Sequence, residues 1–327
     1  MNTGIKLFIS LAIVSATTIS VNAQRVDFSV VSVPEEAGQE FTRMTTDADK
    51  VCLPEVKRRG RSIDWFSNRV LAMVPGTDEI AYLSARNNTT NIFIKDMKKQ
   101  GSSRQRTNRS AVIDFSFSPD GKDLYFSERR GKTNQIFRTS GSSGYICRQI
   151  TNGANDYSPV LTNDGKQVFF TRMENNGSSI WSYNLGNNFL SSYAYGQNPI
   201  PAGDNALIMV RRTPEGRSEL WQFDYESGVE ECIISDSERS FSSPVVSPDG
   251  KWILFVGSSL IQAPGVNYPN TDLFISHLDG TNMRQLTYHA ADDLSPIWSN
   301  DGKYIYFVSQ RGDALGTANI WRLTFAE

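Results

Sequence analysis

Short apolar and aromatic runs, separated by clusters of Gly, Ser, Asn and Asp, follow one another along most of this chain. Four copies of one phrase stand out: SFSPDGKDLYFSE (116–128), VLTNDGKQVFFT (160–171), VVSPDGKWILFV (245–256) and IWSNDGKYIYFV (297–308). β-Branched and aromatic runs bounded by turn residues favour strands. Asp-Gly suits a tight hairpin, because glycine adopts positive φ without steric cost. Each phrase therefore predicts two antiparallel strands joined by a short turn.

The turn recurs six times, at intervals of 40 to 52 residues. Its positions are Gly76, Asp120, Asp164, Asp204, Asp249 and Asp301. An aliphatic-aromatic pair follows each turn and predicts a third strand: Ile92-Phe93, Ile136-Phe137, Ile180-Trp181, Leu220-Trp221, Leu273-Phe274 and Ile320-Trp321. Two independent anchors thus agree on six repeating units, and a period of this length is typical of repeat folds.

A fourth strand is indicated by RQRT at 104, RQIT at 148 and RQLT at 284. Four short strands per repeat predict an all-β fold, a six-bladed β-propeller of four-stranded antiparallel blades. The sixth unit ends after its third strand, whereas FTRMT at 41–45 resembles the missing fourth. We therefore expect residues 41–45 to complete the last blade, which removes a free sheet edge. A β-sandwich is the competing architecture.

The first residues read as an export signal. Lys6, an apolar stretch at 7–19 and a small-x-small pattern at 21–23 predict a signal peptide over residues 1–23 with cleavage before Gln24. Residues 24–40 then form an N-terminal tail, and residues 41–327 form the single propeller domain. We expect a periplasmic protein with no membrane span; the cell surface or secretion are the alternative locations.

Composition excludes some partners. The 33 basic and 35 acidic residues give a net charge of -2, so nucleic acid is a poor fit despite the basic stretches at 57–61 and 95–109. An acidic protein or an acidic envelope polymer stays open as a partner of these stretches. Cys52, Cys147 and Cys232 allow at most one disulfide, and the sequence leaves open whether Cys52 pairs with Cys147 or with Cys232.

Residues for catalysis are sparse. The chain has no G-x-S-x-G motif and only two histidines, His277 and His289, which the predicted repeat places in different blades. The pair Asp292-Asp293 beside His289 is a weak candidate for holding a cation. We therefore expect no enzymatic activity, no catalytic residues, no metal and no cofactor.

Charged positions recur in register at one end of the predicted ring. They have two open interpretations: contacts of the arginines to a carboxylate or to carbonyls of a neighbouring blade, which lock adjacent blades together, or direct contacts to a ligand. The same end receives the longest insertion, at 257–270, whose aromatic residue is a candidate binding anchor. The candidate binding residues are Arg86, Arg130, Arg311, Asp156, Asp293 and Tyr268.

Together, SPDGK after an apolar strand, an aromatic strand, Ile-Trp and Arg-Gln-Leu-Thr resemble the repeat of TolB-type six-bladed propellers. The likeness covers nearly the whole predicted mature chain, although PGTDE at 75–79 and AGDNA at 202–206 depart from it. TolB also carries an α/β domain ahead of its propeller, for which we expect no room here. Similar repeats occur in prolyl-oligopeptidase-like and tricorn-like peptidases and in oligogalacturonate lyases.

The resemblance implies a periplasmic protein that works by binding an envelope protein or peptide. Two alternatives remain: a carbohydrate-active propeller similar to oligogalacturonate lyases, and an accessory subunit of an envelope secretion complex. The sequence specifies neither the partner nor the oligomeric state.

Overall fold

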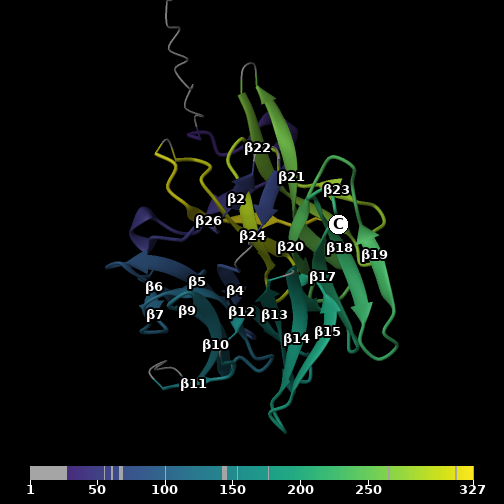
Figure 1. Ribbon diagram of the computed structural model, residues 1–327. Coiled ribbons are helices and arrows are strands. Elements are labelled where there is room, and N and C mark those ends of the chain that lie inside the picture. Colours follow the sequence, from purple (N-terminus) through teal and green to yellow (C-terminus); the bar gives the residue numbers. More distant parts are fainter. Residues whose placement is uncertain are drawn as a thin grey trace, which may run out of the picture.

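Six four-stranded antiparallel sheets stand around a common axis (Figure 1). The computed structural model describes residues 28–54, 56–59, 62–65, 69–99, 101–141, 146–152, 154–175, 177–263, 266–313 and 315–326, and only the backbone of 56–59, 62–65, 259–263 and 266–269. The first strands of consecutive sheets contact one another all the way round the ring, including the sixth and the first. The predicted six-bladed propeller is confirmed.

The first three blades follow in chain order. Blade one is β4 (Leu71–Met73), β5 (Glu79–Arg86), β6 (Thr89–Asp96) and β7 (Arg104–Gln105). Blade two is β8 (Val112–Phe117), β9 (Asp123–Arg130), β10 (Thr133–Ser140) and β11 (Cys147–Gln149). Blade three is β12 (Asn155–Leu161), β13 (Gln167–Glu174), β14 (Gly177–Asn184) and β15 (Leu190–Tyr195).

The remaining blades complete the ring. Blade four is β16 (Gln197–Pro201), β17 (Ala206–Arg212), β18 (Ser218–Asp224) and β19 (Glu230–Ile234). Blade five is β20 (Phe241–Val246), β21 (Trp252–Ala263), β22 (Val266–His277) and β23 (Arg284–Gln285). Blade six is β24 (Asp293–Trp298), β25 (Tyr304–Ser309), β26 (Asn319–Thr324) and β1 (Phe41–Arg43), and a small hairpin, β2 (Val56–Arg59) with β3 (Ser62–Trp65), precedes blade one.

The second strand of each blade is buried on both faces, because each blade packs between two neighbours. In β21, Ile253 and Phe255 belong to the core shared with blade four, whereas Leu254 and Val256 belong to the core shared with blade six. This two-sided burial explains why the aromatic runs are continuous rather than alternating with polar residues.

The repeated turn phrase is a hydrogen-bonded unit. In blade two, Ser118 Oγ donates to Asp120 Oδ1 at 2.7 Å, Asp120 Oδ1 also accepts from Lys122 N at 3.1 Å, and Asp123 N donates to Ser118 Oγ at 2.9 Å. Gly121 has φ of 70°, as the predicted turn requires. We call the end of the ring that carries these turns the turn face.

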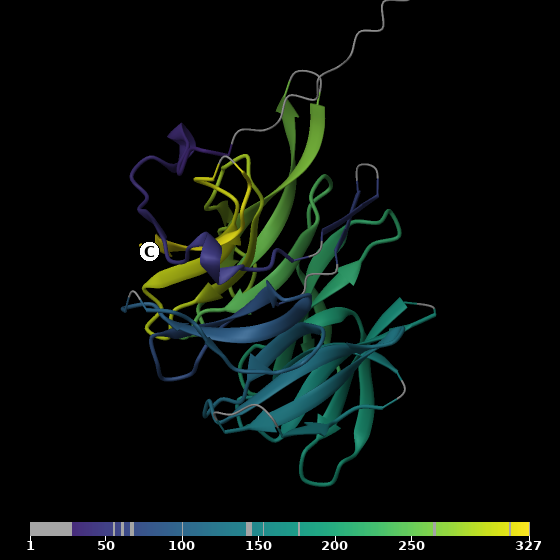
Figure 2. The same cartoon turned by 90° about the vertical axis from the view of Figure 1, so that its left-hand side faces the viewer.

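The opposite end, which we call the hairpin face, carries the tip of the β21–β22 hairpin, which projects well beyond the ring (Figures 1 and 2). The sequence predicted an inserted loop at 257–270, but the ladder continues through it to Ala263 opposite Val266. Pro269 is tolerated there because the projecting part has only two strands, whose outer edges need no ladder partner.

The ring closes as predicted, with the N-terminal strand β1 antiparallel to β26. Phe41 lies opposite Leu323 and Arg43 opposite Trp321, and Figure 2 shows this purple segment beside the yellow last blade. Just beyond β1, Ile320 N donates to Thr45 Oγ1 at 2.8 Å. The threonine that ends RQRT, RQIT and RQLT accepts from the third strand in the same way, through Thr107, Thr151 and Thr287.

Replacing Thr45 with valine tests this closure. Thr45 is 3% exposed, and its hydroxyl also donates to Asn319 Oδ1 at 3.0 Å. Valine keeps the shape but leaves the buried amide of Ile320 without an acceptor, so we expect a loss of about 1–3 kcal/mol in the free energy of unfolding, measured by urea denaturation. The control Thr42→Val, on a partly exposed threonine of the same segment, should change stability by less. Equal effects of the two variants would contradict a closure role for Thr45.

Candidate functional site

A belt of polar groups surrounds the axis, where the first strand of four blades carries a bulge. Its members have positive φ and each precedes a proline: Ser158, Asn198, Ser243 and Ser295. Ser158 Oγ donates to Asn198 Oδ1 at 2.8 Å, which joins blades three and four. Val70 N donates to Ser295 Oγ at 3.1 Å, which joins blades one and six across the closure. These left-handed positions therefore turn backbone and side-chain polar groups toward neighbouring blades.

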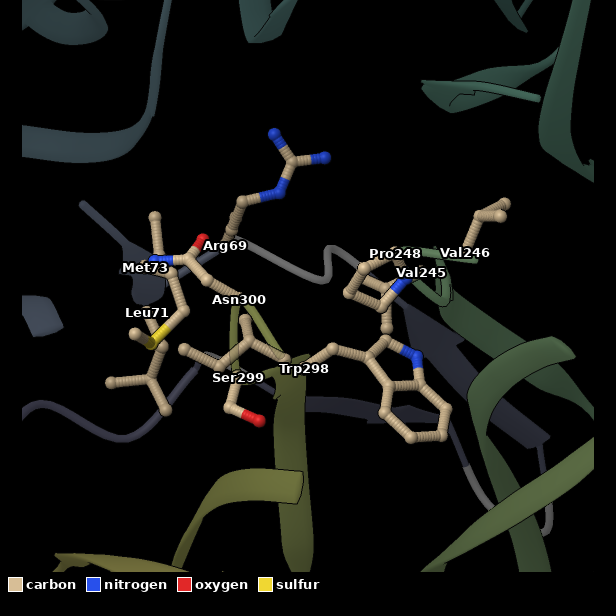
Figure 3. Close-up of a pocket in the computed structure, with 11 residues that line it drawn as sticks. Arg69, Leu71, Met73, Val245, Val246, Pro248, Trp298, Ser299 and Asn300 are labelled. Carbon is tan, nitrogen blue, oxygen red and sulfur yellow. The ribbon is translucent and has the colours of Figure 1, made fainter. Parts of the chain in front are cut away.

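Beside this belt lies a pocket of about 280 Å³ that reaches the turn face (Figure 3). Its walls come from the first strands of blades one, five and six and are mostly apolar, including Leu71, Met73, Val245, Ile297 and Trp298. Turn residues of blades five and six form the part nearest the turn face. The ring thus leaves an apolar recess on its axis that is open at one end.

Arg69 is the one charged residue that lines this pocket. It precedes β4, and its guanidinium extends away from the side chains of Leu71 and Met73 (Figure 3). Nη1 reaches the carbonyl oxygen of Pro159 in blade three at 3.4 Å, so the side chain spans the axis. Burial lowers the pKa of Arg69, while the nearby charge of Asp114 raises it.

Asp114 does not pair directly with Arg69. Ser127 Oγ donates to its Oδ1, and Ser158 N donates to its Oδ2 at 2.8 Å. Burial raises the pKa of Asp114, and these hydrogen bonds oppose that rise. No ion pair within the described part of the chain includes Arg69, so its guanidinium keeps donors for another acceptor.

Arginines of the hairpin face, among them the predicted Arg86 and Arg130, stack on the aromatic anchors of the third strands. In five blades the guanidinium carbon lies 4.0 to 5.7 Å from the ring centroid. The pairs are Arg86 with Phe93, Arg130 with Phe137, Arg172 with Trp181, Arg211 with Trp221 and Arg239 with Phe274. The arginines and the third-strand aromatic residues, which are separate features in the sequence, therefore form a cation–π contact in each of these five blades. Arg86 and Arg130 keep part of their surface accessible.

Three other predicted residues are in buried ion pairs. Asp156 is fully buried and accepts from Arg172 Nε at 2.7 Å within blade three. Arg311 and Asp293 are also fully buried, with Nη2 to Oδ2 at 2.5 Å. Both pairs lie within one blade, so these side chains stabilise the fold by joining strands of the same blade, whereas the sequence suggested contacts between adjacent blades.

The acidic partner that completes the Arg311 pair comes from the N-terminal segment. Glu36, in a short 3-10 turn at Pro34–Glu36, accepts from Arg311 Nη1 at 3.2 Å and from Nη2 at 3.1 Å. The amide of Tyr288 donates to the same carboxylate at 2.9 Å. Residues 28–40, expected as a simple tail, therefore pack on the hairpin face of blades five and six.

Glu36→Gln should destabilise the protein by about 2 kcal/mol or more, because it removes one charge of a buried cluster and turns an amide donor toward Arg311. Thermal and urea unfolding measure the effect. Glu35→Gln, on the exposed neighbour, should leave stability nearly unchanged. If both variants unfold like the wild type, residue 36 does not fasten the segment.

Tyr268 lies on β22 opposite Ile261, near the tip of the projecting hairpin. Its side chain is outside the described residues, as are those of the basic stretch 57–61 and the predicted signal peptide. In the second basic stretch, many side chains are neutralised: Lys95 pairs with Asp49, and Arg104 with Glu79.

The cysteines and His277, whose side chains could take part in chemistry, also have structural surroundings. Cys52, Cys147 and Cys232 form no disulfide among the described residues, and burial raises the pKa of Cys52 to about 11. His277 contacts Thr281 and Trp252 near the turn face. In the part of the chain that the structure describes, no three His, Cys, Asp or Glu side chains gather as metal ligands.

His289 is fully buried at the hairpin face. Its Nδ1 accepts from Ala291 N at 2.9 Å, so Nε2 carries the proton and donates to Val30 O at 3.1 Å. Burial, followed by the charge of Arg311, lowers the pKa of His289 below its usual 6.5. The ring is therefore neutral and joins the N-terminal segment to blade six.

This lowered pKa predicts a pH dependence. The stability that neutral His289 contributes is fully present above about pH 6.5, and it is lost as the pH falls through the lower pKa of the folded state. The free energy of unfolding of His289→Gln should vary less with pH in that window than that of the wild type. The matched variant His277→Gln should keep the wild-type slope, and an unchanged slope in His289→Gln would contradict the assignment.

Six radial blades around an axial pocket define a β-propeller. The chain belongs to the TolB β-propeller family, since the family model described as "TolB beta propeller domain" matches residues 41–249. The Tol-Pal system protein TolB of Anaeromyxobacter dehalogenans is 34% identical over 110 residues, which are 33% of this chain. The matched stretches span 23% of that relative and 10% of another curated relative, a dipeptidyl-peptidase.

Solved structures agree on the fold. TolB from Acinetobacter baumannii gives a TM-score of 0.58 at 19% identity, over 78% of this chain and 66% of that one. An oligogalacturonate lyase from Vibrio parahaemolyticus gives 0.59 at 10% identity, over 91% of this chain and 96% of that one. Identities this low establish the architecture alone.

Sequence reasoning missed Arg69 and its pocket. Arg69 precedes a three-residue strand in the most divergent repeat, and no other blade repeats an arginine at that place. The available signal was weak: an unrepeated charge at the start of an innermost strand.

Proposed function

We propose that this protein is a non-enzymatic binding module of the cell envelope, exported to the periplasm, whose propeller engages a protein or peptide partner. The observation that carries the proposal is that ionisable residues of the hairpin face have structural roles. Asp156, Asp293, Arg311 and His289 are buried in structural contacts, which leaves little for acid–base chemistry at that face. Family membership supports the same direction, because a curated relative is a component of a Tol-Pal system.

The hairpin face is the proposed contact surface. The β21–β22 hairpin projects from it and carries Tyr268, and Arg86 and Arg130 lie at the ends of second strands on the same side. A projecting two-stranded hairpin offers a partner both an aromatic anchor and free backbone edges. Within the described part of the chain, no helix has the length and apolar character of a membrane span.

A carbohydrate-active propeller is the second candidate. It is supported by a likeness to an oligogalacturonate lyase over nearly the whole of both chains. Incubation with oligogalacturonate and detection of unsaturated products by ultraviolet absorbance separates this candidate from the first. Product formation by the wild type would replace the binding proposal.

Affinity capture from intact envelopes tests the binding proposal. The wild type should retain a specific envelope protein, and Tyr268→Ala should weaken that complex about tenfold or more, because aromatic anchors dominate interface energetics. The control is Phe189→Ala, which changes an aromatic residue that is 65% exposed in the connection between β14 and β15, at the turn face. Recovery of nothing above background, or equal weakening by both variants, would contradict the proposal.

A further inference from the structure

The axial pocket at the turn face lies at the other end of the ring from the proposed partner surface. We infer that it binds a small ligand group that carries a carboxylate next to an apolar moiety, with Arg69 recognising the carboxylate. This inference goes beyond the proposed function, because it concerns a different face and does not depend on an envelope partner.

The charge of the pocket is the first argument. Arg69 is a cation in a recess whose other lining side chains carry no charge. Arg69 is partly buried, and an anion and hydrogen-bond acceptors within reach stabilise a partly buried guanidinium. Among the described residues, its guanidinium has one hydrogen-bond acceptor, the carbonyl oxygen of Pro159 at 3.4 Å.

Asp114 supplies a distant countercharge but not a partner. Its two oxygens accept from Ser127 and Ser158, and these bonds are part of the polar belt that joins blades two and three. Arg69 can therefore bind an incoming anion without breaking the belt. Carboxylate is the anion whose two oxygens match the planar fork of a guanidinium.

The apolar side chains that line the pocket determine the chemistry of the rest of the ligand. Leu71, Val245, Ile297 and Trp298 line the pocket together with Arg69. A ligand that reaches Arg69 from the turn face must lie against these side chains, so an apolar group beside the carboxylate gains burial. A pocket of about 280 Å³ is at the small end of ligand sites, which suits one side chain or a chain end.

Isocaproate is a probe with this chemistry, isocaproamide is its uncharged analogue, and acetate lacks the apolar part. Ligand-observed NMR titration of the full protein should show isocaproate binding, with isocaproamide and acetate each about tenfold or more weaker. Equal binding of isocaproate and its amide would overturn the role of the carboxylate. Equal binding of acetate would overturn the role of the walls.

Two variants locate the site. Arg69→Gln should weaken isocaproate binding about tenfold or more, whereas Arg148→Gln, which removes an exposed arginine on the outermost strand of blade two, should not. Ala72→Leu fills the pocket from β4 without touching Arg69 and should also abolish binding. Thermal unfolding establishes that each variant is folded. Unchanged binding in folded Arg69→Gln or Ala72→Leu would overturn the inference.

A titration with digalacturonate tests acidic sugars as the alternative source of the carboxylate. Digalacturonate carries carboxylates on polar rings, so it should bind more weakly than isocaproate. Tighter, Arg69-dependent binding of digalacturonate would overturn the assignment of an apolar ligand. These titrations are independent of envelope capture, so failure of either result leaves the other interpretable.

Discussion

The pairing of β1 with β26 is the constraint on which the rest of this structure depends. A propeller blade buries both faces of its second strand only when it has a neighbour on each side, so the last blade must be complete and lie against the first. Three residues of β1 and the buried hydroxyl of Thr45 supply the missing strand from the far end of the chain. The ion pair of Glu36 with Arg311 and the hydrogen bond from His289 to Val30 add contacts between the N-terminal segment and blade six beyond the β1–β26 ladder.

Most ionisable groups at the hairpin face serve this architecture. Arginines stack on third-strand aromatics, and Asp156 and Asp293 are paired inside their blades. Such contacts satisfy charges that the radial packing would otherwise bury alone. Arg69 is different, because it spans the axis with a single long contact and faces an apolar recess. That contrast is why we assign small-ligand binding to the pocket and a structural role to the buried ion pairs of the hairpin face.

The fold could be read from the sequence because the repeat supplies six copies of the same evidence. The turn, the aromatic pair and the Arg-Gln-x-Thr strand each mark a physical unit, and the shared threonine made FTRMT recognisable as the closing strand. Residues in register also indicated which charges share a face. The ion-pair partners of these charges could not be predicted. Glu36, the partner of Arg311, lies 275 residues away, and Arg172, the partner of Asp156, carries no repeat signal. The insertion at 257–270 was predicted as a loop because its prolines disfavour a strand. The structure accommodates them because the outer edges of this two-stranded ladder need no hydrogen-bond partner.

Native-state hydrogen exchange tests the closed ring most directly. If β1 completes the last blade, the amides that β1 and β26 donate to each other across the ladder, and that of Met44, which donates to the carbonyl of Ile320, should exchange slowly. Rapid exchange of both segments, with protection kept in β24 and β25, would show that the ends of the chain do not pair and would contradict the account.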